Sequence, residues 1–129
     1  MTFSPQLEQR FAKMLTRYPE GRTRSAVIPM LMYAQDEVGA VTREVIEEVA
    51  KRCKVTPVQV DEVVGYYSML HRKPQGKFHV QVCTNISCLL VGGEELYEHA
   101  KKKLGVGHKE TTPCGQFSLE EVECMGACS

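Results

Sequence analysis

The chain has 129 residues, 43% of them hydrophobic and 25% charged, and its 16 Lys and Arg residues balance its 16 Asp and Glu residues. This composition is typical of a globular protein with one domain or two small units, and the zero net charge argues against a nucleic-acid partner, which needs a basic excess. No stretch approaches the about 18 apolar residues of a membrane span, and the first ten residues lack an apolar signal core, so we expect a cytoplasmic protein without membrane insertion.

The first part of the chain, residues 1–73, is expected to form a helical bundle. Apolar residues recur there at helical spacing, as in Leu7, Phe11 and Met14. The segment Thr56-Pro57-Val58-Gln59 combines a capping box with proline at the first helical position, which is the clearest helix start. The four expected helices begin after Ser4, Ser25, Thr42 and Thr56, and the first two end near Pro19 and Gly39.

The second part, residues 74–129, changes to a mixed pattern. Phe78, Val80 and Val82 alternate with polar residues, which is typical of a strand. A helix is expected from about Glu94 to Leu104. A tight turn over residues 113–116 then joins two short strands, residues 109–112 and 117–122. The predicted fold class is therefore α+β, or α/β, with a helical bundle followed by a small sheet domain.

The expected sheet domain ends abruptly. Ser129 follows the last cysteine by one residue, where a sheet of this kind would normally continue. We therefore expect the second domain to be incomplete at its C-terminus, with an exposed strand edge.

Six cysteines in a chain without a secretion signal indicate metal or redox chemistry, because cytosolic thiols are kept reduced. Cys83 and Cys88 follow the first expected strand, and Cys124 and Cys128 follow the last one. Loops that leave neighbouring strands at one edge bring two thiolate pairs together, and four thiolates suit zinc or an iron–sulfur cluster. In a cluster, each pair would bind one iron.

The loop from Cys83 to Gly93 contains no charged residue. The positive end of the helix that follows is expected to stabilise an anionic cluster, and the glutamates just before Cys124 predict a low reduction potential. Four apolar residues are expected to exclude water from the site, while three polar side chains and backbone N–H groups hydrogen-bond to the sulfurs. These residues are Ile86, Leu89, Leu90 and Val91, and Thr84, Asn85 and Ser87.

Spacing and context leave four interpretations of these cysteines open: an iron–sulfur cluster, a structural zinc site, a redox dithiol or inert thiols. The uncharged loop favours the cluster, since zinc usually prefers two-residue gaps and charged, wetter surroundings. Cys53 is expected to be a small core residue and Cys114 a free, exposed thiol in a turn, with a role as an alternative ligand left open. The histidines lie outside both cysteine loops, which disfavours a Rieske-type site, and are expected at the surface; they are His71, His79, His99 and His108.

The two cysteine segments and the helical half together resemble the NuoE family, the small 2Fe-2S subunit of bacterial NADH-quinone oxidoreductase. The resemblance covers nearly the whole chain, including Tyr18-Pro19 and residues 34–37. The segments that carry it are Val82-Cys83-Thr84-Asn85-Ile86-Ser87-Cys88, then Gly92-Gly93, and Leu119-Glu120-Glu121-Val122-Glu123-Cys124-Met125-Gly126-Ala127-Cys128.

The resemblance implies that residues 74–129 form a thioredoxin-like ferredoxin domain in which Cys83, Cys88, Cys124 and Cys128 bind one 2Fe-2S cluster. It implies a one-electron carrier subunit of NADH-quinone oxidoreductase, part of that enzyme but without a catalytic site of its own. The implied partner is the adjacent flavoprotein subunit, which binds NADH and FMN, and the helical half would be the natural docking surface. The chain would then be part of a hetero-oligomer, peripheral on the cytoplasmic side of the inner membrane.

Two other functions stay open. Related chains serve soluble NAD-linked hydrogenases and formate dehydrogenases, and neighbouring genes would distinguish these from the respiratory enzyme. A zinc-stabilised interaction domain without a redox role is the alternative from a different class, and spectroscopy of the reduced protein would distinguish it.

Overall fold

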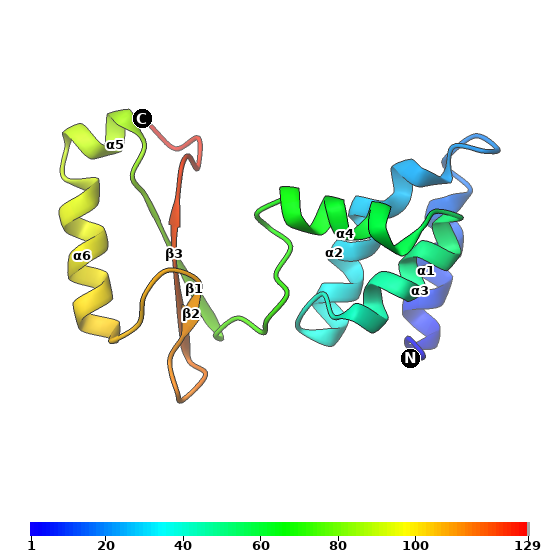
Figure 1. Cartoon of the computed structure of the whole chain (residues 1–129), viewed down its shortest axis with the longest axis horizontal. Helices are drawn as coiled ribbons and strands as arrows, with labels where there is room; N and C mark the ends of the chain where they lie inside the picture. The colour runs from blue at the N-terminus through cyan, green and yellow to red at the C-terminus, as the bar shows by residue number, and fades with distance from the viewer. Residues whose placement is uncertain (129) are drawn as a thin grey trace. The chain divides into compact units, whose positions relative to one another are not determined.

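A computed structural model describes residues 1–128, and the chain divides into two compact units. Residues 1–74 are called the helical unit and residues 75–129 the cysteine unit. Figure 1 shows helices in the first and a sheet with flanking helices in the second. None of the described helices is long and apolar enough to cross a membrane. Ser129, on which the expectation of an incomplete C-terminus rests, lies outside the described residues.

Side-chain caps set the starts of three of the four α-helices in the helical unit. The hydroxyls of Ser4 and Thr42 each accept a hydrogen bond from the backbone N–H three residues on. Thr56 and Gln59 form a complete capping box, as predicted. The second α-helix instead follows a short 3-10 turn, η1 (Thr23–Ala26), and no side chain caps it. The helices are α1 (Pro5–Leu15), α2 (Val27–Val38), α3 (Arg43–Cys53) and α4 (Pro57–Tyr66).

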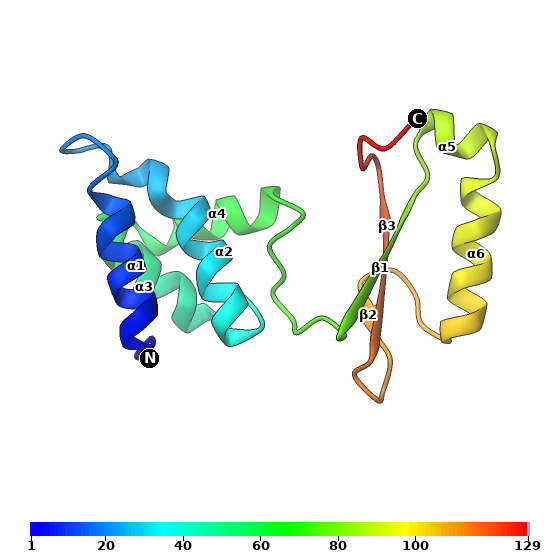
Figure 2. The same cartoon turned by 180° about the vertical axis from the view of Figure 1, so that it is seen from behind.

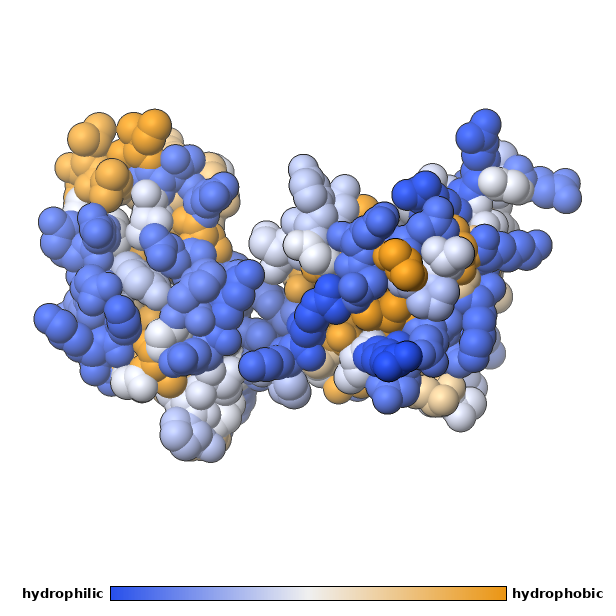
Figure 3. Space-filling model, in the orientation of Figure 1, coloured by the Kyte–Doolittle hydropathy of each residue, from blue (hydrophilic) through white to orange (hydrophobic). Residues whose placement is uncertain are grey.

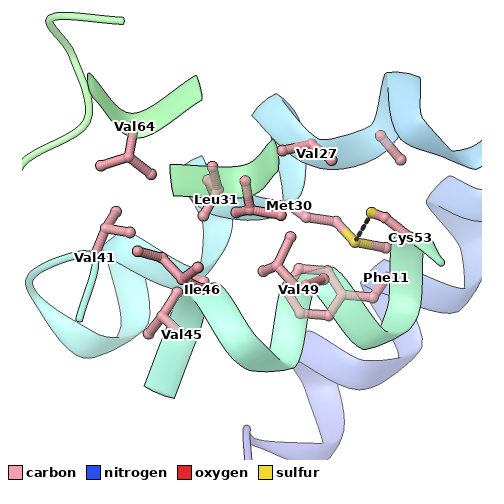
Figure 4. Close-up of a cluster of buried hydrophobic side chains, with 14 of the residues drawn as sticks. Phe11, Val27, Met30, Leu31, Val41, Val45, Ile46, Val49, Cys53 and Val64 are labelled. Carbon is pink, nitrogen blue, oxygen red and sulfur yellow. Dashed lines mark hydrogen bonds between the residues drawn. The ribbon is translucent and has the colours of Figure 1, made fainter. Parts of the chain in front are cut away.

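These four helices bury one apolar core, shown in Figure 4. Met30 and Leu31 of α2 and Val49 of α3 are completely buried. The Sγ atom of Cys53 lies 3.4 Å from the Sδ atom of Met30, so Cys53 is a core residue, as predicted. The residues labelled in Figure 4 are Phe11, Val27, Met30, Leu31, Val41, Val45, Ile46, Val49, Cys53 and Val64.

The cysteine unit is built on a three-stranded sheet with strand order β1-β3-β2. Strand β1 (Phe78–Cys83) pairs parallel to β3 (Phe117–Val122), and β2 (Glu110–Thr111) pairs antiparallel to β3. Between β1 and β2 the chain forms α5 (Ile86–Leu90) and α6 (Gly93–Leu104). The α+β class is confirmed, but α5 lies where the sequence predicted only a loop.

Helix α6 covers one face of the sheet, as both Figure 1 and Figure 2 show. Val82 and Leu119 of the sheet pack with Tyr97 of α6 in a second, smaller core. The parallel register places Gln81 beside Glu120. Since side chains alternate along a strand, the apolar residues face α6 and this polar pair lies on the opposite face.

That opposite face holds a buried carboxylate. Glu120 is 2% exposed, and its Oε2 atom accepts a hydrogen bond from the Gln81 amide at 3.0 Å and lies 3.0 Å from His79 Nε2. His79 Nδ1 lies 2.7 Å from the Ser118 hydroxyl oxygen. The predicted surface position is wrong for His79, whose side chain is 22% exposed, because a buried carboxylate requires hydrogen-bonding partners.

We expect Leu31→Ala to lower the free energy of unfolding by about 2–5 kcal/mol, because it removes a completely buried side chain from the helical core. Met32→Ala, one residue on and 43% exposed, is the control and should change that energy by less than about 1 kcal/mol. Urea unfolding followed by far-ultraviolet circular dichroism measures both. Equal losses in the two variants would contradict the assigned core.

Candidate metal centre

Parallel pairing brings both cysteine pairs to one edge of the sheet. Cys83 ends β1 directly opposite Val122, which ends β3. The Thr84 N–H then donates to the Val122 carbonyl at 3.1 Å, so the chains stay paired as the first loop begins. Because parallel strands end at the same edge, Cys124 leaves the sheet beside Cys83. Figures 1 and 2 both show the described end of the chain close to α5.

Three of the four predicted ligands interact directly. The pKa of Cys83 is lowered by a hydrogen bond from the Asn85 N–H and by one from the Cys88 thiol. The pKa of Cys88 is raised in turn by its hydrogen bond to Cys83, by burial, and by the negative charge of Cys83 and Cys128. Ionisation of one of these thiols therefore disfavours ionisation of the next. A bound cation would remove this penalty.

Backbone N–H groups from both loops donate to the sulfurs. Asn85 and Met125 donate to the Cys83 sulfur, and Gly126 donates to Cys124 Sγ at 3.3 Å. Since Met125 belongs to the second loop and Cys83 to the first, this hydrogen bond joins the two loops. The donors favour the thiolate form of the sulfurs, which is the form that binds metal.

The side-chain donors predicted for Thr84 and Asn85 have other partners. The Thr84 hydroxyl donates to Glu121 Oε1 at 2.7 Å, and the Asn85 side chain accepts from the Ile86 N–H at 2.9 Å as the N-cap of α5. The prediction is therefore wrong for Thr84, whose hydroxyl proton is given to a carboxylate, while the Asn85 oxygen caps the unpredicted helix α5.

Helix α6 begins in contact with the first cysteine loop. A Cβ atom on Gly93, its first residue, would lie 2.7 Å from the Cys83 carbonyl oxygen and 2.9 Å from that of Cys88. Only glycine fits at this distance. The positive N-terminal end of α6 thus lies against the loop, as predicted, and favours an anionic group there.

The apolar residues of the first loop are exposed. Ile86, Leu90 and Val91 are 73%, 81% and 86% exposed, and Leu89 is 45% exposed. The prediction that they exclude water from the site is therefore wrong. Its physical reason is again α5, a short helix that contains Ile86, Leu89 and Leu90 and has Val91 as its C-cap.

No three sulfurs of residues 75–128 are gathered as closely as a zinc site requires. Within residues 75–128, no three His, Cys, Asp or Glu residues place their ligand atoms within 4.8 Å of one another. Tetrahedral zinc with Zn–S bonds of about 2.3 Å requires four sulfurs about 3.8 Å apart. Two pairs on separate loops instead suit a two-iron cluster, in which each pair binds its own iron.

Cys114 lies apart from this arrangement. It is exposed in the turn between β2 and β3, with its Sγ atom 3.3 Å from Thr112 Oγ1. The whole of β3, six residues long, separates this turn from Cys124. Cys114 is therefore an exposed turn residue, as predicted, and the geometry gives no support to its role as an alternative ligand.

Comparison with known proteins shows which family the chain belongs to. The sequence matches the thioredoxin-like 2Fe-2S ferredoxin family over residues 11–129. The chain therefore belongs to this family, which confirms the thioredoxin-like domain, and its cofactor is a 2Fe-2S cluster. Four thiols in two pairs, backbone donors to sulfur and the close approach of α6 at Gly93 all fit that cofactor.

Individual relatives belong to one kind of enzyme. NADH-quinone oxidoreductase subunit 2 of Thermus thermophilus is 45% identical over 122 residues, which are 95% of this chain and 65% of that protein. An NADH-quinone oxidoreductase subunit of Rhizobium meliloti is 44% identical over 128 residues, 99% of this chain and 73% of that protein. Mitochondrial NADH dehydrogenase (ubiquinone) flavoprotein 2 of Dictyostelium discoideum is 40% identical over 117 residues, 90% of this chain and 47% of that protein. The chain thus spans 65% of the length of the first of these relatives.

We expect Gly93→Ala to reduce the iron bound per chain, because its Cβ would collide with the Cys83 and Cys88 carbonyls and push α6 from the loop. Gly107→Ala is the matched control, since a Cβ there meets only the flexible Glu110 side chain, at 3.4 Å. Iron analysis and visible absorption of anaerobically purified protein measure the effect. Full iron content in Gly93→Ala would contradict the contact between α6 and the site.

Proposed function

We propose that this chain is a one-electron carrier subunit of an NADH-quinone oxidoreductase. The observation that carries the proposal is the convergence of two cysteine loops at one sheet edge, where the Cys83 thiol lies 3.6 Å from the Glu123 carbonyl oxygen. The names of the relatives, which refer to NADH-quinone oxidoreductase or NADH dehydrogenase, support it. A bound 2Fe-2S cluster supplies one-electron oxidation and reduction.

The proposed ligands are the four loop cysteines. Cys83, which precedes α5, and Cys88, which lies within it, would hold one iron, and Cys124 and Cys128 would hold the other. The backbone N–H groups of Asn85, Met125 and Gly126 orient the sulfurs and offset part of their negative charge.

Acidic side chains near the loops set the electrostatics of electron uptake. Glu94 and Glu95 in the first turn of α6, and Glu121 and Glu123 beside the second loop, are all exposed. Reduction adds negative charge to this region, so these carboxylates disfavour it. We therefore expect a low reduction potential, which suits a carrier that receives electrons from the strongly reducing NADH.

A flavoprotein is the proposed electron donor. NADH gives up a hydride, which carries two electrons, whereas a 2Fe-2S cluster takes up one at a time, so a flavin must stand between them. The proposed partner is the subunit of the same complex that binds NADH and FMN. The chain would then belong to a hetero-oligomer that is peripheral on the cytoplasmic side of the inner membrane.

We expect NADH to reduce the cluster only when the FMN- and NADH-binding subunit from the same organism is added. Electron paramagnetic resonance of anaerobic samples measures the reduced cluster, and dithionite supplies the positive control because it needs no partner. Rapid reduction by NADH without the flavoprotein, or none with it, would contradict the proposed function. No signal with dithionite, together with stoichiometric zinc, would contradict the cofactor itself.

We expect serine at each proposed ligand to lower the iron bound per chain and to change the paramagnetic signal of what remains, because serine oxygen is a harder ligand than thiolate. Cys53→Ala and Cys114→Ala are the controls and should retain the wild-type signal. Loss of the cluster in Cys114→Ala would overturn the ligand assignment. The four ligand variants are Cys83→Ser, Cys88→Ser, Cys124→Ser and Cys128→Ser.

A further inference from the structure

A side-chain hydrogen bond joins the first cysteine loop to a glutamate of β3. Thr84, the residue after Cys83, donates its hydroxyl hydrogen to Glu121 Oε1 at 2.7 Å. The Thr84 N–H donates to the carbonyl of Val122, the residue after Glu121, at 3.1 Å. Because the main chain of Thr84 is fixed to β3, its hydroxyl holds the Glu121 carboxylate at a defined place beside the loop.

The Glu121 carboxylate lies close to the first proposed ligand. Glu121 is paired with Val82, the residue before Cys83, and neighbouring strands are about 4.8 Å apart. The Cys83 sulfur lies 3.6 Å from the carbonyl oxygen of Glu123, two residues after Glu121. On α6, burial raises the pKa of Tyr97 and the negative charge of Glu121 raises it further, so that charge acts across the space between the sheet and α6. A metal centre on Cys83 would therefore lie within the electric field of this carboxylate.

The negative charge of Glu121 has no cationic partner within the part of the chain that the structure describes. Residues 78–100 and 110–128 contain no lysine or arginine. Figure 3 shows hydrophobic side chains gathered at the end of the cysteine unit that carries α5, in the upper left of the view. Glu94, Glu95 and Glu123 are also exposed there, but among the described residues no hydrogen bond holds their carboxylates. Glu121 is thus the glutamate whose charge is held in place.

We propose that Thr84 is a positioning residue that holds the Glu121 carboxylate beside the first cysteine pair, and that this held charge lowers the reduction potential of the metal centre. The inference rests on the proposed function and names the side chains that set the potential of the carrier. Reduction adds one electron, so the centre becomes one unit more negative, and a nearby carboxylate opposes that change. Water and salt weaken the effect of an exposed charge that moves freely, whereas the Thr84 hydroxyl keeps Glu121 near the site.

The test is a redox titration of the cluster-loaded chain, followed by electron paramagnetic resonance, without any partner protein. We expect Glu121→Gln, which removes the charge but keeps an acceptor for Thr84, to raise the equilibrium constant for reduction by about threefold to tenfold, where tenfold corresponds to about 59 mV. Iron content should be unchanged, because Glu121 is exposed. Glu98→Gln is the matched control, since Glu98 lies more than one turn along α6 from Gly93 and pairs with Lys101. It should change that constant by less than about 1.5-fold.

Variants of Thr84 test whether it acts through Glu121. Thr84→Val removes the hydroxyl and should raise the equilibrium constant for reduction by about twofold, because the carboxylate is then free to move into solvent. Thr84→Ser keeps the hydroxyl and should keep the wild-type potential. In the Glu121→Gln background, Thr84→Val should add nothing, since the charge that Thr84 positions is already absent. An equal effect of Thr84→Val in both backgrounds would overturn the positioning role.

Salt gives a measurement that needs no variant to fold. Added salt screens the carboxylate, so it should raise the potential of the wild-type chain, and by more than that of Glu121→Gln. A wild-type potential that salt does not raise, or an unchanged potential in Glu121→Gln with full iron content, would overturn this proposal and leave the proposed function intact. A cluster that the titration reduces, but that NADH and the flavoprotein together do not, would contradict the proposed function alone. A wild-type chain without a reducible cluster would overturn both.

Discussion

The parallel pairing of β1 with β3 is the constraint on which the cysteine unit depends. It makes two strands that are far apart in sequence end side by side, with Cys83 opposite Val122. A shift of one residue in this register would turn Leu119 away from α6 and Glu120 toward it, at the cost of burying a carboxylate against apolar side chains. Packing of the smaller core against α6 therefore fixes the register of β1 and β3. This register keeps the two cysteine loops side by side.

The loops themselves are stabilised by backbone contacts more than by burial. Cys83 is buried at the end of β1, while Cys124 and Cys128 are exposed. Hydrogen bonds from main-chain N–H groups and the close approach of Gly93 position the first loop. Such a site binds a soft, cationic centre through thiolates while leaving one side open.

Much of this structure could be predicted from local sequence signals. The caps at Ser4, Thr42 and Thr56 act within one helical turn, and the strand alternation from Phe78 depends only on neighbouring residues. The cysteine segments were specific enough to indicate both the family and the cofactor. Their ligand roles remain a prediction that mutagenesis must test.

What could not be predicted depends on contacts between distant residues. Helix α5 has five residues and no amphipathic period, so its sequence resembles a loop that shields a metal site. The exposure of Leu90 and Val91 follows only from where α5 lies on the sheet edge. His79 and Glu120 are 41 residues apart, and only the strand register shows that one hydrogen-bonds the other.

X-ray absorption at the iron edge is the sharpest test of the proposed ligands, because it measures the atoms around the metal without a partner protein. We expect every iron in the loaded chain to have sulfur neighbours only, with a second iron close by. Substituting any one of the four loop cysteines by serine should introduce an oxygen neighbour or remove the iron. A nitrogen or oxygen neighbour in the wild-type protein, or an iron without a second iron beside it, would contradict the claim that two converging cysteine pairs hold one two-iron cluster.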